Sequence, residues 1–288
     1  MHVHTIHSGM CTIPGMRLIC RESYNTPEAL YYTLKRQGMD LVTVTDHDSI
    51  DAAESLRKHP DFFLSEEVTC SLPSGTEIHV GVYDITERDH IELQRRADDF
   101  LSLHAYLNEN EIVYSANHIF SSLTGKRVAQ DFEWFEHAFA AFETRNGCML
   151  ERSNLAAAKF ARILGKAEIG GSDAHARFSL GSCWTEVPEA RTKAEFLDGL
   201  RANRAKAIGE SGSYWKLTRD VLWIGWQMLK QNPLTVPVLL LSPLAPAITA
   251  INYYLERRFA NRWEPEVLME RLAAPAEVYE EVCEEVAA

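Results

Sequence analysis

Histidine and carboxylate side chains recur in this sequence directly after short apolar runs. His2 and His4 form an HxH pair, and Asp46-His47-Asp48 follows the β-branched run 41–45. Ligand-type residues also stand at the ends of later runs: Glu67, His118, Glu143, Asp173 and His175. Imidazole nitrogens and carboxylate oxygens bind zinc, manganese and iron, and a mixed set does not choose sharply among these metals. The recurrence predicts a centre for divalent metal ions.

Taken singly, each of these motifs has an ordinary structural explanation. An HxH pair in a strand is most often two exposed or packed histidines. The segment Gly-Ser-Asp-Ala-His at 171–175 is also typical of a helix N-cap in a loop. Five such segments at successive strand ends of one chain are much harder to explain in that way. The combination therefore favours the metal centre.

The elements that must position these residues alternate between helix and strand. Thr26 and Pro27 start a helix that Gly38 ends, and further helices are predicted at 49–58, 86–109, 127–137, 151–164 and 192–203. Strand-like runs lie between them at 41–45, 62–69, 78–83, 111–118, 138–143, 167–173 and 183–188. This alternation is typical of a parallel α/β architecture, with enough short pieces for a closed barrel of seven strands. The strand ends of such a barrel converge on one face.

His79 begins its apolar run instead of ending it, so a different rule must bring it to that face. A turn at 72–76 separates the runs 62–69 and 78–83, which predicts a β-hairpin. Antiparallel pairing about this turn would place His79 opposite Glu67. About eight ligand-type side chains would then share one rim.

Composition limits the classes of function. Hydrophobic residues make up 46% and charged residues 24%, which is ordinary for a globular protein with a core. The net charge of −12 argues against tight, sequence-independent binding of long nucleic acid, although bound cations can reverse the local sign. The six cysteines contain no CxxC pair, so we expect reduced thiols. With no signal peptide visible, we expect a cytoplasmic protein.

The sequence also resembles the PHP (polymerase and histidinol phosphatase) family over about residues 1–210. The matching segments follow the family's motif order: HVHT (2–5), VTDHDSI (44–50), EEVT (66–69), EIHVGVY (77–83), ANHIF (116–120), FETRNG (142–147) and GGSDAH (170–175). The resemblance implies a distorted, TIM-like (β/α)7 barrel that holds two or three divalent ions of manganese, iron or zinc. It implies that the first ion is held by His2, His4, Glu67 and Asp173.

The resemblance assigns the remaining ligands as well. Glu67 would bridge to a second ion completed by His79 and His118, and a third site would take His47 and His175. Relatives with three ions usually carry a further Asp or His a few residues after HxHT, where this chain has Gly9. Either His7 or a water would have to complete the third site, which leaves its occupancy open.

Two ions held by one carboxylate can share a water, lower its pKa and so provide a hydroxide that attacks phosphorus. Arg145 and Arg177 stand next to motif residues and could clamp a phosphate, although surface arginines beside an acidic loop are as common. His175, where a metal does not engage it fully, is a candidate proton donor to the leaving group.

These residues predict a hydrolase, a metal-dependent phosphoesterase with phosphatase or phosphodiesterase activity. We expect its substrate to be a small phosphate monoester, a nucleotide or the 5′ end of a short oligonucleotide, as for a 5′→3′ exonuclease. No basic stripe or aromatic-interleaved patch indicates stable binding of a long polymer. The alternative is a catalytically silent, metal-binding regulatory or structural PHP module.

The chain divides by composition into a phosphoesterase domain at 1–212 and a hydrophobic helical extension at 213–288. Residues 231–255 contain no charge, and prolines interrupt this stretch at 233, 237, 243 and 246. The prolines favour two short helices joined by a bend over one spanning helix. We expect the extension to cover the barrel, a second copy of the chain in a homodimer, or a membrane surface.

Overall fold

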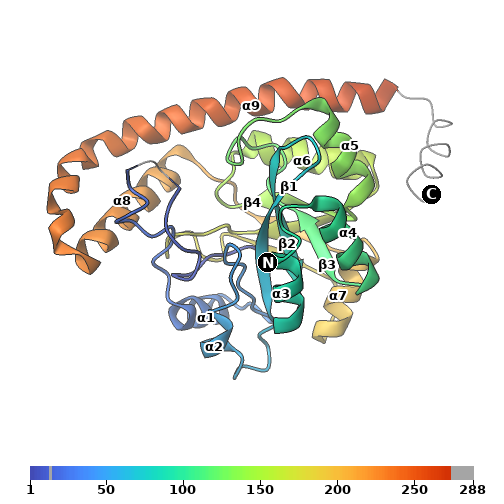
Figure 1. The fold of residues 1–288 in the computed structure, drawn as a ribbon, viewed down its shortest axis with the longest axis horizontal. Helices are drawn as coiled ribbons and strands as arrows, with labels where there is room; N and C mark the ends of the chain where they lie inside the picture. The colour runs from blue at the N-terminus through green and yellow to red at the C-terminus, as the bar shows by residue number, and fades with distance from the viewer. Residues whose placement is uncertain (13–14, 274–288) are drawn as a thin grey trace.

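The structure is a computed structural model that describes residues 1–12 and 15–273, and it is an α/β fold (Figure 1). A mixed central sheet has five strands in chain order: β1 (Ser65–Ser71), β2 (Glu77–Tyr83), β3 (Val113–Ala116), β4 (Ala141–Asn146) and β5 (Ala167–Gly171). The pairs β1–β2 and β2–β3 are antiparallel, and the pairs β3–β4 and β4–β5 are parallel. A smaller antiparallel sheet of β6 (Cys183–Glu186) and β7 (Lys206–Gly209) contacts β5.

The predicted closed (β/α)7 barrel is not confirmed, because no sheet among the described residues closes on itself. Residues 41–45 form no strand, and Val42 makes an isolated parallel bridge with Phe62. Val3 likewise makes an isolated bridge, with Ala174 after β5. A threonine hydroxyl takes the place of a backbone partner here, since Val3 N donates to Thr45 Oγ1 at 3.0 Å. Such side-chain bonds compete with a regular ladder.

The hairpin of β1 and β2 forms as predicted, but its register differs. Glu67 pairs with Gly81, and His79 pairs with Thr69, so Glu67 and His79 are not directly opposite each other. The tight turn is shifted along the chain because Gly75 takes the left-handed position, with φ +80°. Glu67 and His79 still meet as diagonal neighbours on one face of the hairpin, within reach of long side chains.

Helices cover the outside of the sheet (Figure 1). Their bounds are α1 (Pro27–Arg36), α2 (Ala53–Leu56), α3 (Glu87–Gln94), α4 (Phe100–Glu109), α5 (Ala129–Ala138), α6 (Glu151–Ile163) and α7 (Lys193–Arg201). Thr26 caps α1 as predicted, accepting from Ala29 N. The single helix predicted at 86–109 is wrong, because Asp99 caps a second helix by accepting from Leu101 N at 3.1 Å.

The extension differs from two short helices joined by a bend. It consists of α8 (Tyr214–Gln231), the 3₁₀ segment η1 (Pro233–Leu244) and the single 29-residue helix α9 (Ala245–Ala273). Pro233 and Pro246 lie in the first turns of η1 and α9, where a missing backbone N–H costs least, and Pro237 and Pro243 lie inside η1. No helix in the described ranges is long and apolar enough to cross a membrane. The predicted ending beyond residue 273, with Cys283, lies outside the described residues.

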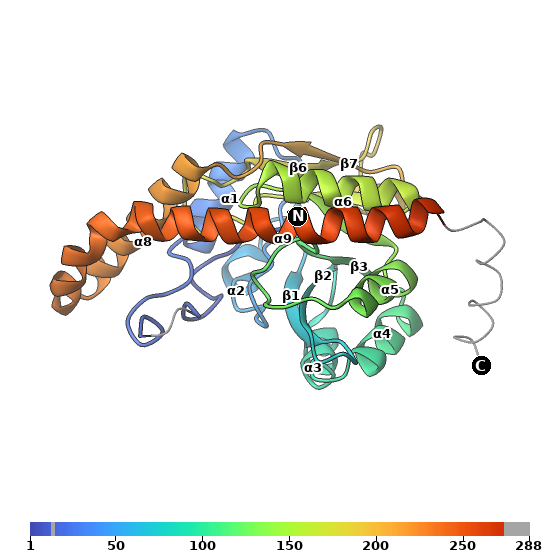
Figure 2. The same ribbon diagram turned by 90° about the horizontal axis from the view of Figure 1, so that it is seen from above.

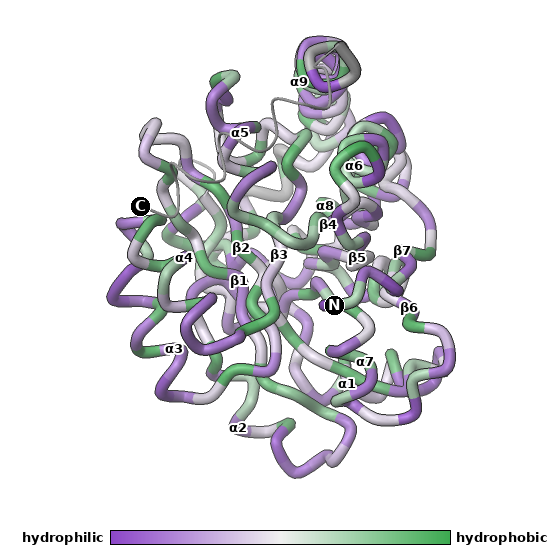
Figure 3. The backbone as a smooth tube through the Cα atoms, turned by 90° about the vertical axis from the view of Figure 1, so that its right-hand side faces the viewer, coloured by the Kyte–Doolittle hydropathy of each residue, from purple (hydrophilic) through white to green (hydrophobic). Residues whose placement is uncertain are grey.

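Helix α9 packs on the α/β unit instead of standing free. It runs beside α6 in Figure 2, and Figure 3 shows the two helices side by side along their axes. Trp263 is buried in the main apolar cluster, with its ring centroid 5.4 Å from that of Phe132. Leu234 and Leu240 in η1 are 88% and 82% exposed. The partner for this exposed apolar segment, a second copy or a membrane surface, stays a prediction.

The burial of Trp263 yields a stability prediction. Trp263→Ala removes a large side chain from a packed core and should lower the free energy of unfolding by about 3–5 kcal/mol. Urea unfolding followed by circular dichroism measures this loss. Trp215→Ala is the control, because Trp215 is 75% exposed and its removal should change stability by less than about 1 kcal/mol. Equal effects of the two substitutions would mean that α9 does not pack as described.

Candidate metal centre

The four residues predicted to hold the first ion lie together in the interior. His2 Nε2 is 3.1 Å from Glu67 Oε2 and 3.5 Å from Asp173 Oδ1. His4 Nε2 is 3.2 Å from the same Asp173 oxygen and 3.5 Å from the same Glu67 oxygen. All four side chains are buried. Two imidazole nitrogens and two carboxylate oxygens therefore converge on one small volume.

The other carboxylate oxygen of Glu67 faces the second predicted pair. Glu67 Oε1 is 3.5 Å from both His79 Nδ1 and His118 Nε2. One carboxylate thus directs one oxygen at each of two histidine pairs. This is the arrangement that a bridging ligand requires, and the bridging role itself stays a prediction.

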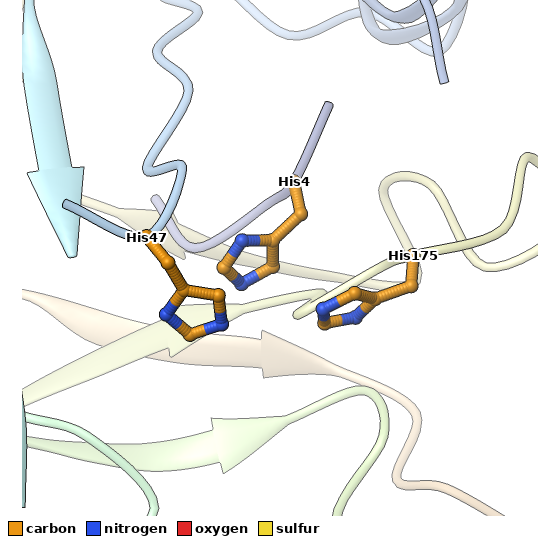
Figure 4. Close-up of side chains that lie close together, drawn as sticks. All are labelled: His4, His47 and His175. Atoms are coloured by element: carbon orange, nitrogen blue, oxygen red, sulfur yellow. The ribbon is translucent and has the colours of Figure 1, made fainter. Parts of the chain in front are cut away.

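His47 and His175 flank His4 from the outer side (Figure 4). Their rings stack on His4 with centroid distances of 4.6 Å and 4.3 Å. One ring nitrogen from each of the three histidines lies within 4.8 Å of the others. All eight residues predicted as ligands are therefore gathered by the fold, although they come from segments scattered along the chain.

Hydrogen bonds to the far ring nitrogens fix the tautomers of His2 and His4. His2 Nδ1 lies 2.8 Å from Glu143 Oε1, and an ionised carboxylate only accepts, so Nδ1 carries the hydrogen. Ser8 Oγ donates to Asp46 Oδ1 at 2.6 Å, so it accepts from His4 Nδ1 at 3.0 Å. In their neutral forms the two rings present lone pairs at Nε2, and these two atoms are 2.9 Å apart. Burial would lower the pKa of His2, but the charges of Glu67 and Asp173 outweigh it and raise this pKa well above its ordinary value. A divalent cation bound here would take the place of the His2 proton, and the far-side bonds are those typical of metal-ligating histidines.

Asp46 belongs to a motif but serves as an anchor. Its two oxygens accept from Thr5 N at 2.5 Å, Thr5 Oγ1 at 2.6 Å and Ser8 Oγ. These bonds hold the turn after HxH and, through Ser8, the ring of His4. The sequence indicated an ionisable group after the run 41–45 but not this positioning role.

Two asparagines were missed as supports of the site, and Glu143 was recognised as a ligand-type residue but not as their partner. Asn117 Nδ2 donates to Glu67 Oε1 at 2.8 Å, and Asn146 Nδ2 donates to Glu143 Oε2 at 2.8 Å and to Asp173 Oδ2 at 3.0 Å. Each asparagine lies within three residues of a motif histidine or carboxylate, which is the only signal that the sequence offered. Such bonds orient carboxylates towards a metal and limit their rotation.

The backbone at the site is strained in a way that suggests function. Asp48, His118 and Asp173 have φ values of 50°, 33° and 48°, in the left-handed region that non-glycine residues seldom adopt. Each such residue costs on the order of 1–3 kcal/mol unless its surroundings hold it there, and such residues cluster at functional sites. Here they turn the chain sharply after strand-like segments and aim the motif side chains inward.

The electrostatics around His4 and Glu67 favour the protonation states that metal binding needs. Burial, followed by the charges of His175 and His47, lowers the pKa of His4 to about 3, so His4 is neutral. Burial would raise the pKa of Glu67, but His2, His79 and His47 outweigh it and hold this pKa well below its ordinary value. Ionised carboxylates beside a neutral imidazole are the required ligand forms. The donor set thus fits divalent manganese, iron or zinc.

The two arginines predicted to bind phosphate make contacts away from the histidine cluster. Arg145 Nη1 lies 3.3 Å from Glu151 Oε2, and the guanidinium of Arg177 lies over the Phe178 ring at 4.7 Å from its centroid. Both contacts are of the kind that surface arginines commonly make. Their roles in binding a phosphate, like the role of His175 as a proton donor, stay predictions.

The central place of Glu67 yields a metal-binding prediction. Wild-type protein saturated with Mn²⁺ and then desalted should retain about two or more ions per chain by elemental analysis. Glu67→Gln should lose most of them, because an amide oxygen carries no charge and a single oxygen cannot serve both histidine pairs. Adding EDTA to the wild type should lower its melting temperature, since an ion that binds only the folded chain stabilises it.

Glu66→Gln is the matched control for this experiment. Glu66 is the buried neighbour of Glu67 on β1, but it faces away from the site and accepts from His90 Nδ1 at 2.8 Å and from Gln94 Nε2 at 3.0 Å. Its substitution should leave the metal count unchanged. A Glu67→Gln protein with full metal content would contradict the assignment.

Comparison with known proteins gives one family match and several structural ones. The family model described as PHP-associated matches residues 151–205. No curated protein matches the sequence. PsfC from Pseudomonas syringae is similar in structure, with a TM-score of 0.54 and 17% identity over 80% of this chain and 97% of that protein. This similarity concerns the fold.

Two further solved structures have lower scores. One is a putative metal-dependent phosphoesterase from Bifidobacterium adolescentis, with a TM-score of 0.41 and 13% identity over 54% of this chain and 84% of that one. The other is a lesion-specific endonuclease from Pyrococcus furiosus, with a TM-score of 0.47 and 16% identity over 72% of this chain and 56% of that one. The family match within residues 151–205 confirms the resemblance to the PHP family that the order of the motifs indicates.

Proposed function

We propose that this chain is a metal-dependent phosphoesterase that hydrolyses a small phosphate monoester, a nucleotide or the 5′ end of a short oligonucleotide. The observation that carries the proposal is the convergence of His2 Nε2 and His4 Nε2, 2.9 Å apart and bordered by two buried carboxylates. One of these carboxylate oxygens, Glu67 Oε2, is buried without a hydrogen-bond partner. Imidazole nitrogens and a carboxylate oxygen gathered in this way are the donors that a bound divalent cation requires.

The side chains at this centre would have three roles: binding the ions, orienting the histidine rings and transferring a proton. His2, His4, Glu67 and Asp173 would hold one ion, and Glu67, His79 and His118 a second one. Bound divalent ions lower the pKa of water and neutralise phosphate charge, which is the chemistry that phosphoester hydrolysis needs. Glu143 and Ser8 keep the His2 and His4 rings in the metal-binding tautomer. His175 lies at the outer side of the cluster and 23% of its side chain is exposed, so it could pass a proton to a leaving group.

The charge of the chain supports a small substrate. The net charge is −12, and long-range attraction of a polyanion is therefore weak. A compact phosphate can still enter, because bound divalent cations reverse the local sign at the centre. Arg145 and Arg177, which stand near motif residues, are the proposed contacts for additional phosphate oxygens.

A panel of phosphate esters with Mn²⁺ tests the proposal. Hydrolysis should require the metal, and Asp173→Asn and His118→Ala should each lower kcat/KM at least about 100-fold, because each removes a ligand. His137→Ala is the control, since His137 is exposed on α5 and lies outside the cluster. Circular dichroism establishes that the variants are folded. Unaltered hydrolysis in both ligand variants would place the active site elsewhere.

The same assay addresses the alternative of a silent metal-binding module. That module would bind Mn²⁺ in the wild type, lose it in Glu67→Gln and hydrolyse none of the esters. An active wild type whose hydrolysis falls together with its metal content supports the phosphoesterase. The two functions therefore predict the same metal content and differ only in turnover.

A further inference from the structure

We propose that Glu22 supplies the carboxylate of a third divalent-cation site, together with His47 and His175. Glu22 lies outside every motif that indicated the metal centre, and Gly9 occupies the position where three-ion relatives of the PHP family usually have an acidic residue or a histidine. The inference rests on the proposed metal centre and identifies the residue that completes its outermost site.

The chain brings Glu22 to the place of the missing side chain. Glu22 N donates to Gly9 O at 3.2 Å, and Met10 and Arg21 form an isolated antiparallel bridge. A further bond from Cys11 N to Cys20 O, 3.0 Å long, extends the pairing. The segment after HxHT therefore folds back on itself, and its returning arm places Glu22 beside Gly9.

The nitrogens that face Glu22 are available as ligands. His175 Nδ1 donates to the backbone oxygen of Asp173 at 3.0 Å, and its Nε2 is buried without a hydrogen-bond partner. In the neutral form of this ring, which metal binding requires, the lone pair is at Nε2. His47 Nδ1 lies 3.2 Å from Glu67 Oε2, so the other nitrogen of this ring is directed outward. Both Nε2 atoms face the carboxylate of Glu22.

The distances match shared coordination better than hydrogen bonding. His47 Nε2 is 3.6 Å from Glu22 Oε2, and His175 Nε2 is 3.6 Å from Glu22 Oε1. These separations exceed those of N–H···O hydrogen bonds, which are mostly about 2.7–3.2 Å. Ligand atoms that each lie about 2.1 Å from one ion are separated by about 3.0–3.4 Å at octahedral or tetrahedral angles. A small closure of the three side chains around an ion would reach that range.

The other nearby groups already have partners. His4 stacks between His47 and His175 (Figure 4), but its Nε2 faces His2 and Asp173. His7, the other candidate for completing this site, lies on the side of Asp51, with 3.9 Å between Nδ1 and Oδ2. Glu22 therefore fills the role that the sequence left open between His7 and a water.

Metal stoichiometry tests the assignment. The wild type, Glu22→Gln and the control Glu54→Gln, whose side chain is 89% exposed, are saturated with Mn²⁺, desalted and analysed for metal content. We expect about three ions in the wild type and in the control, and one fewer in Glu22→Gln. The Glu22 side chain is only 22% exposed, so circular dichroism checks that the variant is folded. Should it unfold, Glu22→Asp keeps the charge and should bind the third ion at least about tenfold more weakly.

Moving the carboxylate from position 22 to the neighbouring position 9 provides a second, independent readout. Gly9 has φ +85° and nothing lies within 4 Å of the place that a Cβ atom would occupy, so an aspartate fits there at a cost of roughly 1 kcal/mol of backbone strain. Gly9→Asp combined with Glu22→Gln should restore the lost ion. An unchanged metal count in Glu22→Gln overturns this inference alone. A wild type that retains no Mn²⁺ overturns the proposed metal centre, so the two failures are distinguishable.

Discussion

The carboxylate of Glu67 is buried among five imidazole rings, and this cluster constrains the surrounding chain. A buried carboxylate without partners costs several kcal/mol, so the fold must bring cationic or donor groups to both of its oxygens. Asn117 donates to Glu67 Oε1, and histidine nitrogens approach Oε2 and Oε1 to 3.1 Å and 3.5 Å. Backbone contacts also hold the segment of His47 against β1. An isolated parallel bridge joins His47 to Glu67, and Asp48 N donates to Glu67 O at 2.9 Å. Each of these contacts draws a chain segment towards the same point.

This convergence explains why the sheet is irregular at its edges. The segments that carry His4 and His47 must turn inward to reach the cluster, and a regular ladder would not let them do so. Threonine hydroxyls such as that of Thr45 then take the place of backbone partners, and left-handed residues such as Asp173 end the segments sharply. The regular part of the sheet lies away from these edges, where the phenylalanine-rich core packs against helices.

The sequence predicted which side chains the fold gathers, because their identity and their place after apolar runs are local features; their roles as ligands stay predictions. The α/β class and most helices were equally accessible, as with Thr26 and α1. Three features could not be predicted from local sequence patterns, because they depend on contacts between distant parts of the chain or on single backbone angles. The hairpin register follows the left-handed Gly75, and the last part of the extension is one long helix, α9, packed through Trp263. Glu22 is brought to the site by a segment that folds back on itself and has no periodic pattern. A closed barrel was inferred from strand-like composition, which does not distinguish a strand from an extended segment held by side chains.

The order of the ligands along the chain also has a kinetic meaning. Ser172 Oγ donates to His2 O across a separation of 170 residues, so the first and last parts of the cluster are neighbours only in space. During synthesis, His2 and His4 are made long before Asp173, and domains generally fold as units. Contacts of such large sequence separation form slowly because their loop must close first. The two histidines therefore lack their carboxylate partner Asp173 until most of the chain has been made, and the complete centre cannot assemble earlier.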